Sequence, residues 1–172
     1  MRRSATHARL ALSPSEATHM TGTPHNTDDA LVLDCVRLRP SARIPSRQTT
    51  GATGYDLHAC IDAPIEIGTL PVRVPCGIAF AAPEGADVQV RPRSGLSARG
   101  VLAVLGTVDA DYRGELMVTL YRLPGAEPLT VNDGDRIAQL VVSRAVAVAW
   151  HEVEHLDDTA RGAGGHGSTG LG

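Results

Sequence analysis

From Leu31 onward, the chain is a succession of short apolar or alternating segments, separated at short intervals by Gly, Pro and Asp. Apolar segments of this length, bounded by turn-forming residues, are typical of β-strands. We predict strands over residues 31–38, 55–59, 72–74, 78–82, 88–91, 101–105, 116–121 and 137–148. Apart from one turn near residues 94–99, no segment sustains the 3.6-residue apolar repeat of a helix. Many short strands joined by tight turns predict an all-β fold, either a sandwich or a barrel.

Both ends of the chain depart from this pattern. Residues 1–29 are rich in Ser, Thr, His and Pro and show no periodicity, so we expect a disordered N-terminal extension. A transit peptide and a true start at Met20 are alternatives for this stretch. Residues 157–172 contain the sequence RGAGGHGSTGLG, which is too rich in glycine for a core strand. We expect a flexible arm whose backbone can approach phosphate oxygens closely, which leaves residues 30–156 as the β-domain.

Composition narrows the classes of function. A chain of 172 residues, 42% of them hydrophobic, suits one globular domain with a sizeable core. The formal net charge of -3 gives no basic field for nucleic acid, and no apolar run approaches the length that spans a membrane. All 16 basic residues are Arg, which excludes a Walker P-loop, a Schiff base and a lysine general base. An anion site must then use guanidinium groups, hydroxyls and backbone N–H groups.

The cysteines bear on the cellular compartment. Cys35, Cys60 and Cys76 are odd in number and lack CxxC spacing. They are typical of small buried residues in a reducing compartment. Because the N-terminal stretch also lacks an apolar signal core, we expect a cytoplasmic protein.

Five polar segments stand out from the apolar runs. They read TGYDLHA (53–59), RPRSGLS (91–97), GTVDADYRGE (106–115), GDRIAQL (134–140) and, in the arm, RGAGGHGSTG (161–170). Each of these segments alone could be an ordinary turn. Together and in this order they resemble the five motifs of the trimeric dUTPase family, and the resemblance extends from residue 32 to residue 170.

The resemblance implies a distorted jelly-roll β-barrel that assembles as a homotrimer, with three active sites at the subunit interfaces. The C-terminal arm of one chain would close a site that is built by two others. The implied activity is the Mg²⁺-dependent hydrolysis of dUTP to dUMP and diphosphate. We expect dUTP and the other subunits as partners, and neither nucleic acid nor membrane.

Hydrolysis at the α-phosphorus requires a positioned water, a base, neutralisation of charge and exclusion of bulk solvent. By resemblance, Asp109 orients the attacking water and contacts the 3′-hydroxyl of the sugar. Asp111 lies two residues further on and, in an extended segment, would point to the opposite face. We therefore assign the chemistry to Asp109 alone.

The resemblance also implies which residues contact the base and the sugar. The ring of Tyr112 would stack on the deoxyribose and leave no room for a 2′-hydroxyl. The hairpin over residues 101–113 would offer backbone groups to uracil, notably from Gly106, Thr107 and Val108. A snug backbone wall would exclude thymine by its methyl group and cytosine by its donor at position 4. One departure is Ala103, where many bacterial members carry an Asn that contacts uracil, so recognition would lean more on backbone contacts.

The remaining candidates would bind the triphosphate. The resemblance assigns the phosphates next to the sugar to Arg93, Ser94, Gly95 and Gln139. Asp56 would hold Mg²⁺ through the water shell of the metal, since Mg²⁺ takes phosphate oxygens as its main ligands.

The arm would contribute Arg161, His166, Gly167, Ser168 and Thr169. Of these, Arg161, Ser168 and Thr169 would clamp the γ-phosphate. The ring of His166, at a position that is usually Phe in the family, would stack on uracil.

The same motifs argue against two other classes of protein. A dCTP deaminase, a relative with the same fold, carries its catalytic glutamate in a TLE string after the counterpart of DADYRG. Here the string reads Thr119-Leu120-Tyr121, so that acid/base is absent. A non-catalytic nucleotide-binding protein on this scaffold would be expected to lack Asp109 or the glycine-rich arm, and both are present.

Overall fold

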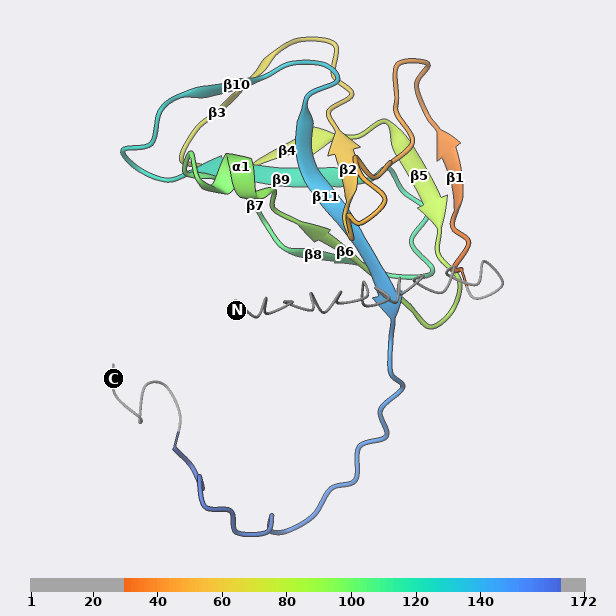
Figure 1. Cartoon of the computed structure of the whole chain (residues 1–172), viewed down its shortest axis with the longest axis vertical. Coiled ribbons are helices and arrows are strands. Elements are labelled where there is room, and N and C mark those ends of the chain that lie inside the picture. Colours follow the sequence, from red (N-terminus) through yellow and green to blue (C-terminus); the bar gives the residue numbers. More distant parts are fainter. Residues whose placement is uncertain (1–29, 165–172) are drawn as a thin grey trace, which may run out of the picture. The chain divides into compact units, whose positions relative to one another are not determined.

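The computed structural model describes residues 30–164 (Figure 1). Contacts divide the chain into two units, Met1–Ala30 and Leu31–Gly172, and the described elements belong to the second. The strands are β1 (Asp34–Arg37), β2 (Tyr55–His58), β3 (Ile65–Ile67), β4 (Val72–Pro75), β5 (Ile78–Ala81), β6 (Ala86–Arg91), β7 (Val101–Ala103), β8 (Gly106–Val108), β9 (Met117–Arg122), β10 (Leu129–Val131) and β11 (Arg136–Arg144). A one-turn helix, α1 (Ser94–Ser97), follows β6. The extension expected over residues 1–29 lies outside the described residues.

The described strands form four antiparallel sheets (Figure 1). The largest has the order β2-β11-β6-β8, and a three-stranded sheet has the order β4-β9-β7. Two further pairs are β1-β5 and β3-β10. In all of these pairs the partners are distant in sequence, so the chain crosses repeatedly from one sheet to another. The all-β prediction is confirmed, and no helix among residues 30–164 has the length and apolarity needed to cross a membrane.

The core comes from alternate residues of these strands. On β9, Val118 and Leu120 are buried, whereas Thr119 between them is partly exposed. This period of two is expected for a strand with one face against the core. The thiols of Cys60 and Cys76 are buried as predicted, at 1% and 2% exposure, and the third cysteine, in β1, is half-buried.

The predicted strands match observed ones, with ends that differ by a few residues, and the predicted turn near residues 94–99 is α1. The sequence does not predict β3, β8 and β10, which are each three residues long. Three residues carry too little alternation to be recognised, and β8 lies inside a segment that looks polar.

The last strand is shorter than predicted, because β11 ends at Arg144 and not at residue 148. From residue 146 to residue 163 every residue is exposed and no strand forms (Figure 1). Several apolar side chains of this segment face solvent: the exposed fractions are 85% for Val146, 66% for Val148 and 94% for Trp150. The alternation that predicted a longer strand is therefore present, but these residues have no partner strand within the described chain.

Candidate active site

A cavity of about 320 Å³ lies between the β7–β8 hairpin, the loop after β8 and the strands β4 and β9. Its lining brings together the residues that the sequence assigned to catalysis, sugar and base: Gly106, Thr107, Val108, Asp109 and Tyr112. It also includes residues that the sequence did not single out: Arg73, Val104, Glu115, Met117 and Thr119. This volume is in the range of sites that bind small molecules.

Tyr112 is held against the loop that carries it. Its hydroxyl donates a hydrogen bond to the backbone carbonyl of Glu115 at 3.0 Å. A methyl group at Gly114 would lie 2.4 Å from this hydroxyl oxygen, so the ring occupies space that only glycine leaves open. The Tyr112 side chain remains 46% exposed, and its ring is available at the cavity as a flat surface.

The two aspartates of the motif are placed differently. The backbone N–H of Tyr112 bonds the carbonyl of Asp109 at 3.1 Å, so residues 109–112 form a turn. Arg113 braces this turn by donating to the carbonyls of Ala110 at 2.6 Å and Tyr112 at 2.8 Å. The expectation that Asp111 lies in an extended segment is therefore wrong. Both aspartates are exposed, but Asp109 lines the cavity and Asp111 does not.

Glu115 ties this loop to the core. Its carboxylate accepts a hydrogen bond from the backbone N–H of Gly77 at 2.8 Å, in the turn between β4 and β5. Burial raises the pKa of the neighbouring Cys76 thiol to about 12, and the Glu115 carboxylate and Cys60 add to this. Cys76 is therefore a neutral thiol at ordinary pH, and Glu115 fixes the backbone to which Tyr112 bonds.

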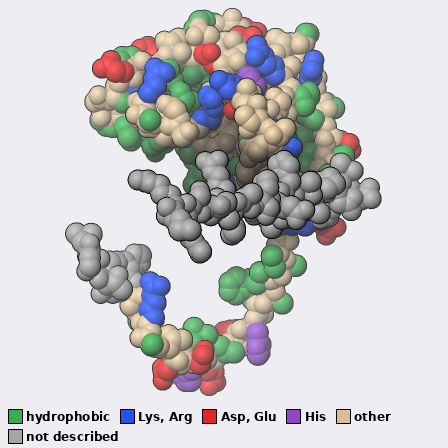
Figure 2. Space-filling model, viewed as in Figure 1, with side chains coloured by type: hydrophobic (Ala, Val, Ile, Leu, Met, Phe, Trp, Pro, Cys, Tyr) green, Lys and Arg blue, Asp and Glu red, His purple; other side chains and the backbone are tan. Residues whose placement is uncertain are grey.

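A second group of candidates surrounds Asp56, which is 8% exposed on β2. Its two carboxylate oxygens form ion pairs with Arg93 Nε at 3.2 Å and Arg136 Nη1 at 3.1 Å. Arg93 also donates to the backbone carbonyl of Arg136 at 2.8 Å. Arginine side chains gather on the face of the molecule seen in Figure 2. Asp56 thus holds two guanidinium groups in place, in an arrangement that can bind an anion.

Gln139 is fixed next to this group. It pairs in register with Asp56 between β11 and β2, and its amide donates to the carbonyl of Pro92 at 2.9 Å. A methyl group at Gly54 would lie 2.0 Å from its side-chain oxygen. Ser94 and Gly95 are exposed at the start of α1, directly after Arg93. The structure therefore brings the predicted phosphate ligands of the barrel together around β2, α1 and β11.

His58 lies in the same group and was not predicted. It is 8% exposed, and its Nδ1 is the one buried side-chain nitrogen or oxygen without a hydrogen-bond partner among the described residues. Burial lowers the pKa of His58, the guanidinium of Arg43 lowers it further, and Asp56 opposes this shift. Arg43 itself packs over Gly134, where a methyl group would lie 2.8 Å from its Nη2. A pairing across strands creates this group, so a linear motif gives no signal for it.

The described residues do not form a metal cage. They contain no group of three or more His, Cys, Asp or Glu side chains that could hold a metal ion. Asp56 is engaged by two guanidinium groups, and the remaining lone pairs of its carboxylate can accept from water. This donor set fits a metal that arrives with phosphate oxygens and contacts the protein through its water shell.

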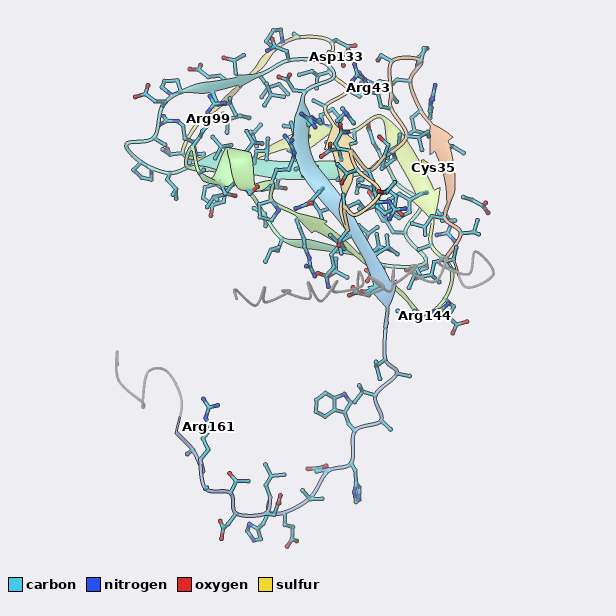
Figure 3. All side chains as sticks on the ribbon, viewed as in Figure 1. Cys35, Arg43, Arg99, Asp133, Arg144 and Arg161 are labelled. Atoms are coloured by element: carbon cyan, nitrogen blue, oxygen red, sulfur yellow. The ribbon has the colours of Figure 1, made fainter. Side chains whose placement is uncertain are left out.

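The arm is described only as far as Gly164. Arg161 is exposed, and its Nε donates to the carbonyl of Gly164 at 2.8 Å. In Figure 3 it lies on the segment that follows Arg144, beyond the end of β11. The other predicted arm ligands, His166, Gly167, Ser168 and Thr169, lie outside the described residues.

One sheet joins the cavity to the group formed by Asp56, Arg93 and Arg136, which we call the arginine group. β11 pairs with β2, where Asp56 lies, and also with β6, whose Val90 lines the cavity and pairs with Gly106 of β8. Arg93 comes two residues after the end of β6, so the predicted phosphate ligands and the cavity are carried by neighbouring strands.

Comparisons with known proteins agree with this arrangement. The family model described as dUTPase matches residues 40–170. The deoxyuridine 5'-triphosphate nucleotidohydrolase of Wolinella succinogenes is 51% identical over 139 residues, which cover 78% of this chain and 91% of the relative. The protein of the same name from Corynebacterium glutamicum is 47% identical over 145 residues, covering 83% and 97% respectively.

Solved structures show the same fold. A Staphylococcus bacteriophage 80alpha dUTPase with dUpNHpp superposes with a TM-score of 0.69 at 22% identity, over 81% of this chain and 99% of that chain. A dUTPase from phage phi11 of S. aureus, described with a structural Mg(II) ion, gives 0.63 at 21% identity, over 72% and 97%. The predicted jelly-roll fold is therefore confirmed. With a family model matched over most of its length and relatives that share about half of its residues, the chain belongs to the dUTPase family.

Proposed function

We propose that this protein is a dUTP diphosphatase, which hydrolyses dUTP to dUMP and diphosphate. One observation carries the proposal: Asp109, Tyr112 and the β7–β8 hairpin all line one cavity. A carboxylate base, a sugar platform and a wall of backbone groups are what selective hydrolysis of a deoxyuridine nucleotide requires.

In the proposed reaction, Asp109 accepts a proton from a water molecule as that water attacks the α-phosphorus. The bond from the α-phosphorus to the bridging oxygen breaks, and diphosphate leaves with the electron pair. The turn closed by Tyr112 and Arg113 holds Asp109 in place, so little reorganisation is needed at the moment of attack. Tyr112 excludes a 2′-hydroxyl by occupying the space beneath the sugar.

The triphosphate would lie against the arginine group. Arg93 and Arg136 supply charge, Ser94 and Gly95 supply hydrogen-bond donors, and Gln139 orients the α-phosphate. Bound Mg²⁺ would neutralise charge on the phosphates and orient them. Asp56 would contact that ion through water while it keeps hold of the two guanidinium groups.

The arm would complete a neighbouring site in a homotrimer. The exposed apolar side chains of residues 146–156 favour this proposal, because a contiguous apolar surface of this kind marks an interaction site. Arg161, Ser168 and Thr169 would then clamp the γ-phosphate, and Gly167 would allow the backbone close to it. The ring of His166 would cover the uracil. In the cytoplasm such an enzyme would limit uracil in DNA and supply dUMP for thymidylate synthesis.

Diphosphate release from dUTP, UTP, dCTP and dTTP tests the proposal. We expect kcat/KM for dUTP to exceed that for each of the others by at least about a hundredfold, because polar groups left unpaired by a wrong base are costly. Comparable kcat/KM on dTTP, or ammonia release from dCTP, would show that the assignment is wrong.

A further inference from the structure

We propose that Arg73 determines base specificity by donating a hydrogen bond to the carbonyl oxygen at position 4 of the pyrimidine. This inference rests on the proposed function and names a residue that selects its substrate. Arg73 lies on β4, outside the polar motifs, and nothing in the linear sequence connects it with the site.

The strand pairing places Arg73 in the wall of the cavity. Arg73 of β4 pairs in register with Thr119 of β9, and the backbone N–H of Val104 bonds the carbonyl of Thr119 at 2.8 Å. All three residues line the cavity that contains Asp109 and Tyr112. Val104, Thr119 and Arg73 thus form a row across the sheet β4-β9-β7, on the side opposite the buried Val118 and Leu120.

The guanidinium of Arg73 is available to a ligand. Among the described residues it has no hydrogen-bond or ion-pair partner, whereas Arg93, Arg113 and Arg136 are all engaged. Glu115, one of the two carboxylates that line the cavity, is already bonded to the backbone of Gly77. Arg73 therefore brings unused donors to the cavity.

The chemistry of the lining explains why this residue would discriminate between bases. The hydroxyls of Thr107 and Thr119 can donate or accept, so they tolerate either a carbonyl or an amino group. A guanidinium only donates. It would donate a hydrogen bond to the position-4 oxygen of uracil. In cytosine it would face the position-4 amino group, which is also a donor, so no hydrogen bond could form.

The test compares Arg73→Met, which keeps the apolar stem, with Arg73→Lys, which keeps a donor and the charge. We expect Arg73→Met to lower kcat/KM for dUTP about ten- to a hundredfold, mostly through KM, and to leave dCTP nearly unchanged. The ratio of dUTP to UTP, which the Tyr112 platform sets, should stay constant. Arg73→Lys should keep most of the dUTP preference. Arg37→Met, an exposed arginine of β1 outside the cavity, is the matched control and should behave as wild type.

Equal losses on dUTP and dCTP in Arg73→Met, or no loss on either, would overturn the proposal. Native mass measurement identifies a variant that has lost its assembly, and such a general loss also counts against base recognition. Calorimetric binding of dUMP and dCMP gives a second measure of the same preference without turnover. If wild-type protein fails to hydrolyse dUTP, the proposed function itself is wrong, which is a different outcome from a failure of Arg73 alone.

Discussion

Two glycines decide where large side chains of the site lie. Gly114 leaves room for the hydroxyl of Tyr112, and Gly54 leaves room for the amide of Gln139. Neither requires a left-handed backbone, since a positive φ is recorded for neither of them. Their contribution is the absence of a methyl group, which makes them direct tests of how closely the site is packed.

Gly114→Ala should displace the Tyr112 ring, because the added methyl would lie 2.4 Å from its hydroxyl oxygen. We expect kcat/KM for dUTP to fall about tenfold or more, since a misplacement near 1 Å can cost about a hundredfold. The preference for dUTP over UTP should narrow at the same time. Gly51→Ala is the control, because nothing lies within 4 Å of a methyl group there. An unchanged dUTP preference in Gly114→Ala would mean that the ring does not exclude the 2′-hydroxyl.

The two aspartates of the same loop can be separated by matched substitutions. Asp109→Asn should lower kcat by about 10² to 10⁴, the range for a positioned general base. Binding of a non-hydrolysable dUTP analogue should survive, because the phosphate-binding groups remain. Asp111→Asn, which changes an exposed side chain outside the cavity, should have little effect. A loss of similar size at Asp111 would show that the base has been assigned to the wrong carboxylate.

At the scale of elements, the pairing of β2 with β11 builds the arginine group. It places Asp56 opposite Gln139. The register of this pairing shifts between Arg136 and Ala138, next to the ion pair of Arg136 with Asp56. Because Asp56 holds both Arg93 and Arg136, its charge is part of the site even before a metal arrives.

Asp56→Asn tests this point. Removal of the charge should lower the free energy of unfolding by about 1–2 kcal/mol, a value reduced by the partial exposure of both arginines. Affinity for a dUTP analogue should fall on the order of tenfold in EDTA as well as in Mg²⁺, since the guanidinium groups lose their anchor. Titration of the analogue with and without the metal checks this. A loss seen only in Mg²⁺ would mean that Asp56 acts through the ion alone.

The sequence predicts those parts of the fold and site that depend on neighbours along the chain. Strands such as β9 follow from alternation, and Asp109 and Tyr112 belong to one contiguous motif. Arg73 could not be found in this way, because it reaches the cavity only through its register with Thr119. His58 and Glu115 were missed for the same reason, since their surroundings come from strands and turns distant in sequence.

At the scale of the whole molecule, the described segment after β11 carries large apolar side chains that are not buried within one chain. Val146, Val148 and Trp150 alternate with alanines, as a strand requires, yet they are exposed. Burial of such residues would contribute about 1.5–3 kcal/mol for each large side chain, so we expect them to pack against another subunit.

Chains that end at Asp158 should form a folded trimer with little activity, because the removed residues contribute nothing to the described core. Mixed with full-length Asp109→Asn chains, they should regain part of the activity if an arm serves a neighbouring subunit. Each restored site would combine the carboxylate of one chain with the arm of another. Mixed trimers confirmed by native mass but without activity would argue that each arm closes its own subunit's site.

Trp150 lies on the segment that leads from β11 into the arm, where it offers a natural label. It is the single tryptophan of the sequence, and its indole is 94% exposed in the isolated chain. An indole in water emits at longer wavelength than one packed against apolar side chains, so docking of this segment on another subunit would shift the intrinsic emission toward the blue. The natural fluorescence of this protein would therefore report on the proposed assembly.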